Sequence, residues 1–412
     1  MRILVVVLLW ALCSQTASSA DSSLVWSADI RVRGEADGRD FNNKTPLFGY
    51  TTLRTRLGVR GTPSEGVHVV VQLQDGRLFG SEQPSAVSNT GTPQSQFLDL
   101  HQGYLQLDRF AFDGLTVQAG RMELSYGDEQ MVGQNDWSAF GQAFDLVRIR
   151  FQSGGHSADV FAAKIVRTTM LPVQVSPFTV DQPPDQGFLF SGFWYSLPPL
   201  VPIGLAVSFF HEWDARDNVL SRGTLGLHAT ASSHDFLGRV ECEYQGGHMG
   251  GLGVSAFMVT ASVGYVVPGG VADTLSGGIR YLSGTGAGDQ TDHTFSTTFG
   301  SPHDQSGAMD YFGDPAAGTN GRGLQDLYAR CRLELSGVTG LGISLHQFTL
   351  AKAWSGENLL GQEADLLLRY SAWTSACLEG GISLFHPGSV MKAWYNQSDL
   401  SVWGYIGARV WL

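Results

Sequence analysis

The sequence has little charge, few cysteines and no run of basic residues. Charged side chains make up 16% of the 412 residues, and the net charge at pH 7 is −12. Because nucleic acids are bound through clustered Lys and Arg, this balance argues against a nucleic-acid-binding protein. The four cysteines include no closely spaced pair, which argues against a metal motif and against a disulfide framework.

The chain beyond its N-terminus also lacks a long hydrophobic run. No later stretch stays apolar over the roughly 20 residues that a membrane helix needs. The N-terminus has a charged start, an apolar segment at 3–12 and small residues at Ser18-Ser19-Ala20. This pattern predicts a secretory signal over residues 1–20, and we expect residues 21–412 to form a single mature domain.

What the sequence does have is arginine at alternate positions of otherwise apolar segments. The pairs are Arg31 and Arg33, Arg54 and Arg56, Arg148 and Arg150, and Arg330 and Arg332. Successive side chains of a strand point to opposite faces, so such segments have one apolar face and one cationic face. That division predicts a barrel wall with lipid outside and a charged, wet lumen, which is a pore for anions rather than an enzyme cleft.

Strand-like segments of mostly 9–13 residues recur along the chain, and each is long enough to cross a bilayer when tilted. We predict eighteen, at 24–34, 50–60, 66–78, 97–108, 115–126, 143–153, 156–167, 187–197, 202–213, 222–231, 236–246, 252–266, 273–283, 326–336, 340–351, 363–373, 377–386 and 400–412. Sixteen strands is one alternative, because 156–167 and 187–197 alternate poorly. A soluble β-sandwich, in which the apolar face would be a core, is another.

Short turns and long polar loops alternate between these segments. The longest predicted loops are 34–49, 79–96, 127–142, 168–186 and 283–325. Outer-membrane barrels place short turns in the periplasm and long loops outside the cell. The predicted fold is therefore an all-β, transmembrane antiparallel β-barrel in a bacterial outer membrane.

Several motifs, taken together and in order, resemble the alginate export family of outer-membrane porins. They include LRTRLGV at 53–59, VQLQDGR at 71–77, LDLHQGY at 98–104, GRMELSYGD at 120–128 and Asp136-Trp137, with further similar pieces at 281–286, 311–313, 326–328, 360–366 and 385–388. The similarity runs over nearly the whole mature chain. It implies an eighteen-stranded barrel with a narrow, basic lumen through which a secreted polyuronate passes.

This resemblance also implies a set of substrate-binding residues in the lumen. The arginines are Arg54, Arg56, Arg77, Arg121, Arg148 and Arg150, and the acids Asp75, Glu123 and Asp128 are expected to fix their side chains. A planar, permanently charged guanidinium matches the carboxylate of a uronate. Arg330 and Arg332, set among acids, are expected to be wall scaffolding. The alternative is that all these arginines pair with wall acids and only hold the barrel in shape.

The predicted function is passive export of an alginate-like anionic polysaccharide. The alternative is a porin for uptake of small anionic or neutral nutrients, and a secreted soluble β-protein that binds or hydrolyses polysaccharide is less favoured. Glu241 and Glu243 form a carboxylate pair, but no catalytic signature accompanies them, so no enzyme and no cofactor are predicted. The acids and histidines at 293–314 lack a metal-ligand spacing, so no metal site is predicted.

The expected partners follow from this function and fold. They are the anionic polysaccharide, outer-membrane lipid and the barrel-insertion machinery, while a periplasmic export scaffold is left open as a further partner. No nucleic acid is expected, and a closed barrel of this kind is expected to be a monomer.

Overall fold

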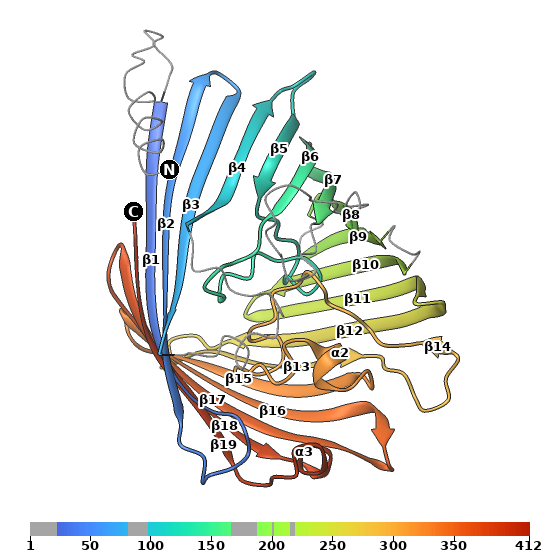
Figure 1. Cartoon of the computed structure of the whole chain (residues 1–412). Coiled ribbons are helices and arrows are strands. Elements are labelled where there is room, and N and C mark those ends of the chain that lie inside the picture. The colour runs from blue at the N-terminus through green and yellow to red at the C-terminus, as the bar shows by residue number, and fades with distance from the viewer. Residues whose placement is uncertain (1–22, 81–97, 166–187, 200–201, 215–218) are drawn as a thin grey trace, which may run out of the picture.

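The computed structural model describes residues 23–80, 98–165, 188–199, 202–214 and 219–412. Within them, eighteen antiparallel strands form a closed barrel, in which each strand pairs with its neighbours along the chain and β1 pairs with β19 (Figure 1). The strands are β1 Ser23–Gly38, β2 Phe48–Ser64, β3 Val67–Phe79, β4 Asp99–Asp108, β5 Leu115–Met122, β6 Phe144–Ser153, β7 His156–Ile165, β8 Phe188–Ser196, β9 Ile203–Asp214, β10 Leu220–Ser233, β11 Phe236–Met249, β12 Leu252–Val266, β13 Ala272–Leu282, β15 Leu324–Ser336, β16 Thr339–Trp354, β17 Glu357–Trp373, β18 Ala376–Pro387 and β19 Ser401–Trp411.

Three short elements lie in the loops. The two-residue strand β14 (Thr291–Asp292) pairs in parallel with β12, α2 (Pro315–Gly318) follows it, and α3 (Ser389–Tyr395) lies between β18 and β19. None of the helices in the described ranges is long and apolar enough to cross a membrane.

Alternation of the side chains builds the wall as the sequence predicts. On β6, Val147 and Ile149 are 50% and 45% exposed on the outer face, whereas Leu146 and Arg148 are 5% and 9% exposed on the inner face. Apolar side chains facing outward and polar side chains facing inward are the pattern of a barrel in lipid. The soluble β-sandwich alternative is therefore wrong.

The predicted count of eighteen strands is confirmed, and the alternative of sixteen is wrong. The two poorly alternating segments form the neighbouring strands β7 and β8. The segment predicted at 115–126 ends as a strand at Met122, because the chain then turns inward and buries Leu124 and Tyr126. The predicted signal at 1–20 and most of the loops predicted at 79–96 and 168–186 lie outside the described residues.

The core of this protein lies inside the barrel. The loop 123–143 between β5 and β6 and the loop 283–323 between β13 and β15 fold within the ring of strands (Figure 1). Their apolar side chains pack with inward-facing residues of the wall in one cluster, which includes Leu124, Val132, Phe295, Met309, Phe312, Phe348 and Phe385. The loops thereby narrow the lumen and bring their own polar groups to the arginines of the wall.

Candidate functional site: the arginine-lined lumen

Three arginines on adjoining strands form one row across the inner wall. Arg31 of β1 lies opposite Arg409 of β19 and Arg54 of β2 in the strand register. Like charges at this spacing repel one another unless anions lie between them. Asp29 of β1 supplies one such anion, and its carboxylate accepts hydrogen bonds from Arg54 at 3.0 Å and from Arg409 at 2.6 Å.

A second carboxylate reaches the row from loop 123–143. Oδ1 of Asp136 lies 2.7 Å from Nη1 of Arg54 and 3.3 Å from Nη1 of Arg56, and Oδ2 lies 3.0 Å from Nη1 of Arg409. The Arg54 side chain is 0% exposed, so its charge is balanced within the protein. One loop carboxylate therefore joins arginines from β2 and β19, on either side of β1.

Backbone oxygens of the same loop engage the neighbouring arginines. Arg31 donates to the carbonyl oxygens of Asp136, Trp137 and Ser138 at 2.6, 2.7 and 2.9 Å. Arg33 donates to the Trp137 carbonyl at 2.9 Å, and its guanidinium lies 3.6 Å from the centre of the Trp137 ring. We call residues 136–138 the latch, because they connect the loop to the basic wall.

The surroundings of Asp136 keep its carboxyl group ionised down to low pH. Burial opposes ionisation, but the positive charges of Arg54, Arg409 and Arg56 outweigh it and lower the pKa of Asp136 from its ordinary 3.8 to about 2. The ionised carboxylate is therefore present in the latch at any pH above about 4.

This depressed pKa predicts how latch docking depends on pH. Because the pKa is lower in the docked loop, the stabilisation is complete above the ordinary pKa of 3.8 and is lost as the pH falls through about 2. Hydrogen exchange of the peptide 130–142, corrected for its intrinsic pH dependence, should stay equally slow from pH 7 to pH 5 and become faster towards pH 2. Faster exchange already at pH 5 would contradict the assignment.

Glu123 fixes Arg56, as the sequence predicts for the acids of the motif. Its carboxylate lies 3.3 Å from Arg56 and 2.7 Å from Nε2 of His101 on β4. Gln74 of β3 accepts a further hydrogen bond from Nε of Arg56 at 2.6 Å. The guanidinium is thus held in one orientation beside the latch.

Arg148 and Arg150 share a different acid. Both pair with Asp159 of β7, and the distance from Nε of Arg150 to Asp159 is 2.8 Å. The Arg148 side chain is 10% exposed and stands over the ring of Tyr126, whereas the Arg150 side chain is 36% exposed. Of this pair, Arg150 offers the larger surface to the lumen.

The prediction that Asp75 and Arg77 line the lumen is wrong. On β3, Gln74 and Gly76 face inward, because Gln74 bonds Arg56 and Gly76 lies against Phe140 of loop 123–143. Alternation then places Asp75 and Arg77 on the outer face, where they pair at 2.8 Å. The sequence itself indicates this orientation, because Asp75 and Arg77 occupy the same alternate positions of the strand as the apolar Val71 and Leu73.

Arg121 is the third predicted lumen residue that faces outward. Its neighbours Gly120 and Met122 lie on the inner side, and Met122 is 2% exposed in the core. Arg121 lies opposite Asp145 of β6 and pairs with it at 3.2 Å, on the side that also carries Val147. The family-like motif led to the residue, but the phase of the strand excludes it from the lumen.

The remaining predicted residues lie inside the barrel. Asp128, in loop 123–143, forms an ion pair with Arg239 of β11. Arg330 pairs with Asp304 of the other loop at 3.4 Å, which agrees with a scaffolding role. Arg332, by contrast, is exposed on the inner face of β15 and is therefore accessible from the lumen.

Loop 283–323 supports the latch from the opposite side. The ring of His303 stacks on Trp137, with the centroids 3.7 Å apart and the planes 7° from parallel. Arg280 of β13 donates to Ser306 of this loop at 2.8 Å and to Gln130 of the latch-bearing loop at 2.9 Å. The two loops therefore form one plug, and movement of the latch disturbs both.

Acidic side chains line the wall on β9, β11, β15 and β17. Glu241 and Glu243 of β11 flank His228 of β10 at 3.6 and 3.4 Å, and Asp326 of β15 pairs with His346 at 2.9 Å. The lumen is thus mixed in sign, with its basic row on β19, β1 and β2, where Asp29 accompanies the arginines, and these further acids on β11 and β15. No group of three or more His, Cys, Asp or Glu in the described ranges is arranged to hold a metal ion.

The family assignment rests on the sequence. The model of the alginate export family matches residues 24–323, which is more than half of the chain. The chain belongs to the alginate export family. No curated protein matches it.

Solved porins share the fold of this alginate export family member at low sequence identity. Pseudomonas aeruginosa OpdK with vanillate aligns with a TM-score of 0.60 at 12% identity, over 94% of this chain and 98% of that chain. P. aeruginosa OccK8 (OprE) gives 0.64 at 12% identity over 95% and 98%. A BenF-like porin from Pseudomonas fluorescens Pf-5 gives 0.62 at 10% identity over 95% and 98%. These likenesses show the fold, and together with the family match they make the chain an outer-membrane porin barrel.

Proposed function

We propose that this porin passively exports an alginate-like polyuronate. The observation that carries the proposal is the composition of the latch site. Besides Asp29 of the wall, the row of Arg31, Arg54 and Arg409 binds one carboxylate and several carbonyl oxygens of the latch. A uronate sugar offers the same set, a carboxylate beside neutral polar oxygens, and guanidinium groups bind such sets through directed hydrogen bonds.

Further inward arginines provide contacts away from the latch. Arg60, Arg332 and Arg369 lie near the periplasmic ends of β2, β15 and β17, and all three are exposed. With Arg150 they form a series of weak sites along which a polyanion exchanges partners. Conduction requires such weak, repeated binding, because one tight site would trap the chain.

The latch gives the proposed pore a resting barrier. A polyuronate that reaches the row replaces Asp136 with its own carboxylate. The ion pairs that the arginines lose with Asp136 are then replaced by ion pairs with the substrate. A neutral sugar has no such group and leaves the latch closed. On this account, Arg31, Arg54 and Arg409 belong both to the binding site and to the gate.

The test is ion selectivity and block in planar bilayers. The purified porin should pass anions preferentially, and uronate oligomers should block its current whereas neutral glucose oligomers of equal length should not. In R148Q/R150Q, the anion-to-cation permeability ratio should fall about two- to fivefold, because two of the fixed charges near the path are removed.

The matched control is R77Q, which removes an arginine from the outer wall and should leave selectivity unchanged. An unchanged ratio in R148Q/R150Q would make that pair structural. Cation selectivity together with no block by uronates would overturn the proposed function.

Uptake of small carboxylates is the second candidate. The observation that favours it is the likeness in fold to OpdK, which was solved with vanillate. Liposomes containing the porin would distinguish the two. Passage of small aromatic carboxylates without passage of uronate oligomers longer than about ten sugars would favour uptake, and passage of long oligomers favours export.

A further inference from the structure

Charged residues face outward from one quadrant of the barrel. Arg121 of β5, Asp145 of β6 and Lys164 of β7 lie abreast in the strand register, so a carboxylate stands between two cations. Lys164 is exposed, and its neighbours Phe161 and Ala163 are buried on the inner face at 2% exposure each. An outward charge is costly in hydrocarbon but costs little near the membrane surface.

A second outward cation lies on β3. Nε of Arg77 donates to both oxygens of Asp75, at 2.9 and 2.8 Å. This arrangement uses one edge of the guanidinium and directs the group along the outer wall. The Arg77 side chain is 40% exposed, so its other nitrogens are accessible to a further anion.

Two of these cations, Lys164 and Arg77, lie at the height of the headgroups of the outer leaflet. A tilted barrel strand rises roughly 2.5 Å per residue along the membrane normal. Lys164 lies eight residues from His156, where β7 begins at the periplasmic side, and Arg77 lies ten residues from Val67 on β3. Both are therefore roughly 20–25 Å above the periplasmic turns, against an apolar band of about 25 Å.

Other parts of the wall are neutral at a comparable height. Eight residues from the periplasmic end of β11 the outward residue is Tyr244, and at the same position of β16 it is Gln347. The charge on β3, β5, β6 and β7 is therefore a local feature of the outer wall and not a general property of its rim.

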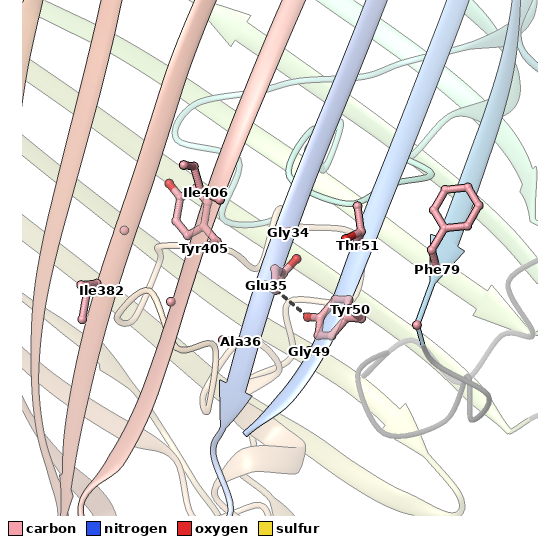
Figure 2. Close-up of a pocket in the computed structure, with 13 residues that line it drawn as sticks. Gly34, Glu35, Ala36, Gly49, Tyr50, Thr51, Phe79, Ile382, Tyr405 and Ile406 are labelled. Atoms are coloured by element: carbon pink, nitrogen blue, oxygen red, sulfur yellow. Dashed lines mark hydrogen bonds between the residues drawn. The ribbon is translucent and has the colours of Figure 1, made fainter. Parts of the chain in front are cut away.

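An apolar groove of about 710 Å³ reaches β3 at Phe79, two residues beyond Arg77. Small residues on β1, β2 and β19 form it, among them Gly34, Ala36, Gly49 and Gly404, and Figure 2 shows Ile382 and Ile406 on one side and Phe79 on the other. Phe79 is the next outward residue after Arg77 on β3. The groove extends from the extracellular end of β3 to lower positions on β18 and β19.

We propose that this quadrant binds a phosphate-bearing lipid of the outer leaflet. Arg77, Arg121 and Lys164 contact phosphate groups, and one acyl chain lies in the groove between Phe79 and Ile406. Two features support a lipid as the occupant, namely the cations Arg77 and Lys164 at the height of the headgroups and an adjoining apolar groove that runs from Phe79 to lower positions on the wall at Ile382 and Ile406. Asp75 and Asp145 pair with Arg77 and Arg121 and orient their guanidinium groups.

The test is native mass spectrometry of the purified barrel in detergent. The probe is bisphosphorylated lipid A, compared with the same lipid after both phosphates have been removed. The unmodified barrel should prefer the phosphorylated form. R77Q/R121Q/K164Q should lose about tenfold or more in affinity for it and bind both forms alike, because each cation near a membrane surface adds to the attraction of anionic lipid.

A second variant tests the groove. G34L fills it without a clash at the backbone, since a Cβ at Gly34 would meet only Thr51 Oγ1, at 3.8 Å. It should weaken binding of both lipid forms equally. The lumen variant R60Q/R332Q/R369Q removes three charges from the inner face and should keep the affinity of the unmodified barrel.

Three outcomes would overturn the proposal. They are equal binding of the two lipid forms by the unmodified barrel, full affinity in R77Q/R121Q/K164Q, and an equal loss in the lumen variant. A dimer of barrels that R77Q/R121Q/K164Q dissociates would make the occupant a second copy of this chain instead. Each variant is first checked for anomalous migration of the unheated protein on a gel, which reports a closed barrel.

Discussion

Replacing Asp136 with asparagine should increase the time that the pore spends in its high-conductance state about tenfold or more. The substitution keeps the shape of the side chain but removes the charge that Arg54, Arg56 and Arg409 share. Hydrogen bonds to charged groups contribute about 1.5–3 kcal/mol each. Loss of even one such contribution shifts a two-state equilibrium about tenfold. Single-channel recording in planar bilayers measures the change directly.

The matched control for this prediction is D145N, which removes a carboxylate from the outer wall. It should leave the dwell times unchanged, because Asp145 faces away from the lumen. W137A provides a second route to the same state, since it removes the ring that Arg33 and His303 contact. Identical dwell times in D136N and the unmodified porin would show that the latch does not limit conduction.

Replacing Arg54 with methionine should destabilise the barrel by about 3–5 kcal/mol. Arg54 is fully buried between Asp29 and Asp136, and the substitution leaves both carboxylates short of a partner. Removing one member of a buried pair costs this much because the remaining charge stays desolvated. Urea-induced unfolding of the porin in lipid vesicles, followed by intrinsic fluorescence, measures the free energy of unfolding.

A double variant separates this effect from simple loss of packing. R54M/D136N also removes one of the two carboxylates that lose a partner in R54M. It should recover part of the lost stability, because Arg54 and Asp136 interact directly. R77Q, whose ion pair is exposed on the outer wall, should cost less than about 1 kcal/mol. Equal losses in R54M and R77Q would mean that burial of Arg54 does not matter for stability.

The fold could be predicted from local patterns. Strand length and the period of two are properties of short segments, and the eighteen strands follow from them with shifts of a few residues at their ends. Even β7 and β8, whose pattern is weak, occupy the predicted segments. β5 is the informative exception, because Leu124 and Tyr126 continue an apolar pattern that belongs to the plug rather than to the wall.

The site was predicted less completely, for two physical reasons. Asp75, Arg77 and Arg121 were assigned to the lumen by motif, although the phase of their own strands faces them outward. Arg54 was expected to face substrate, and its contact with Asp136 joins residues 82 positions apart in the chain. Such a contact depends on the path of a loop, and no local pattern reports that path.

The sequence by itself determined that arginines alternate with apolar residues on strands of a membrane barrel, because alternation is a property of each strand alone. Only the tertiary structure decided which of those arginines are available. Loop 123–143 folds inward, packs on loop 283–323 and places the Asp136 carboxylate on the basic row. The physical reason is that a buried guanidinium needs an anion, and the nearest anion of Arg54, Asp136 at 2.7 Å, comes from a distant loop rather than from its own strand.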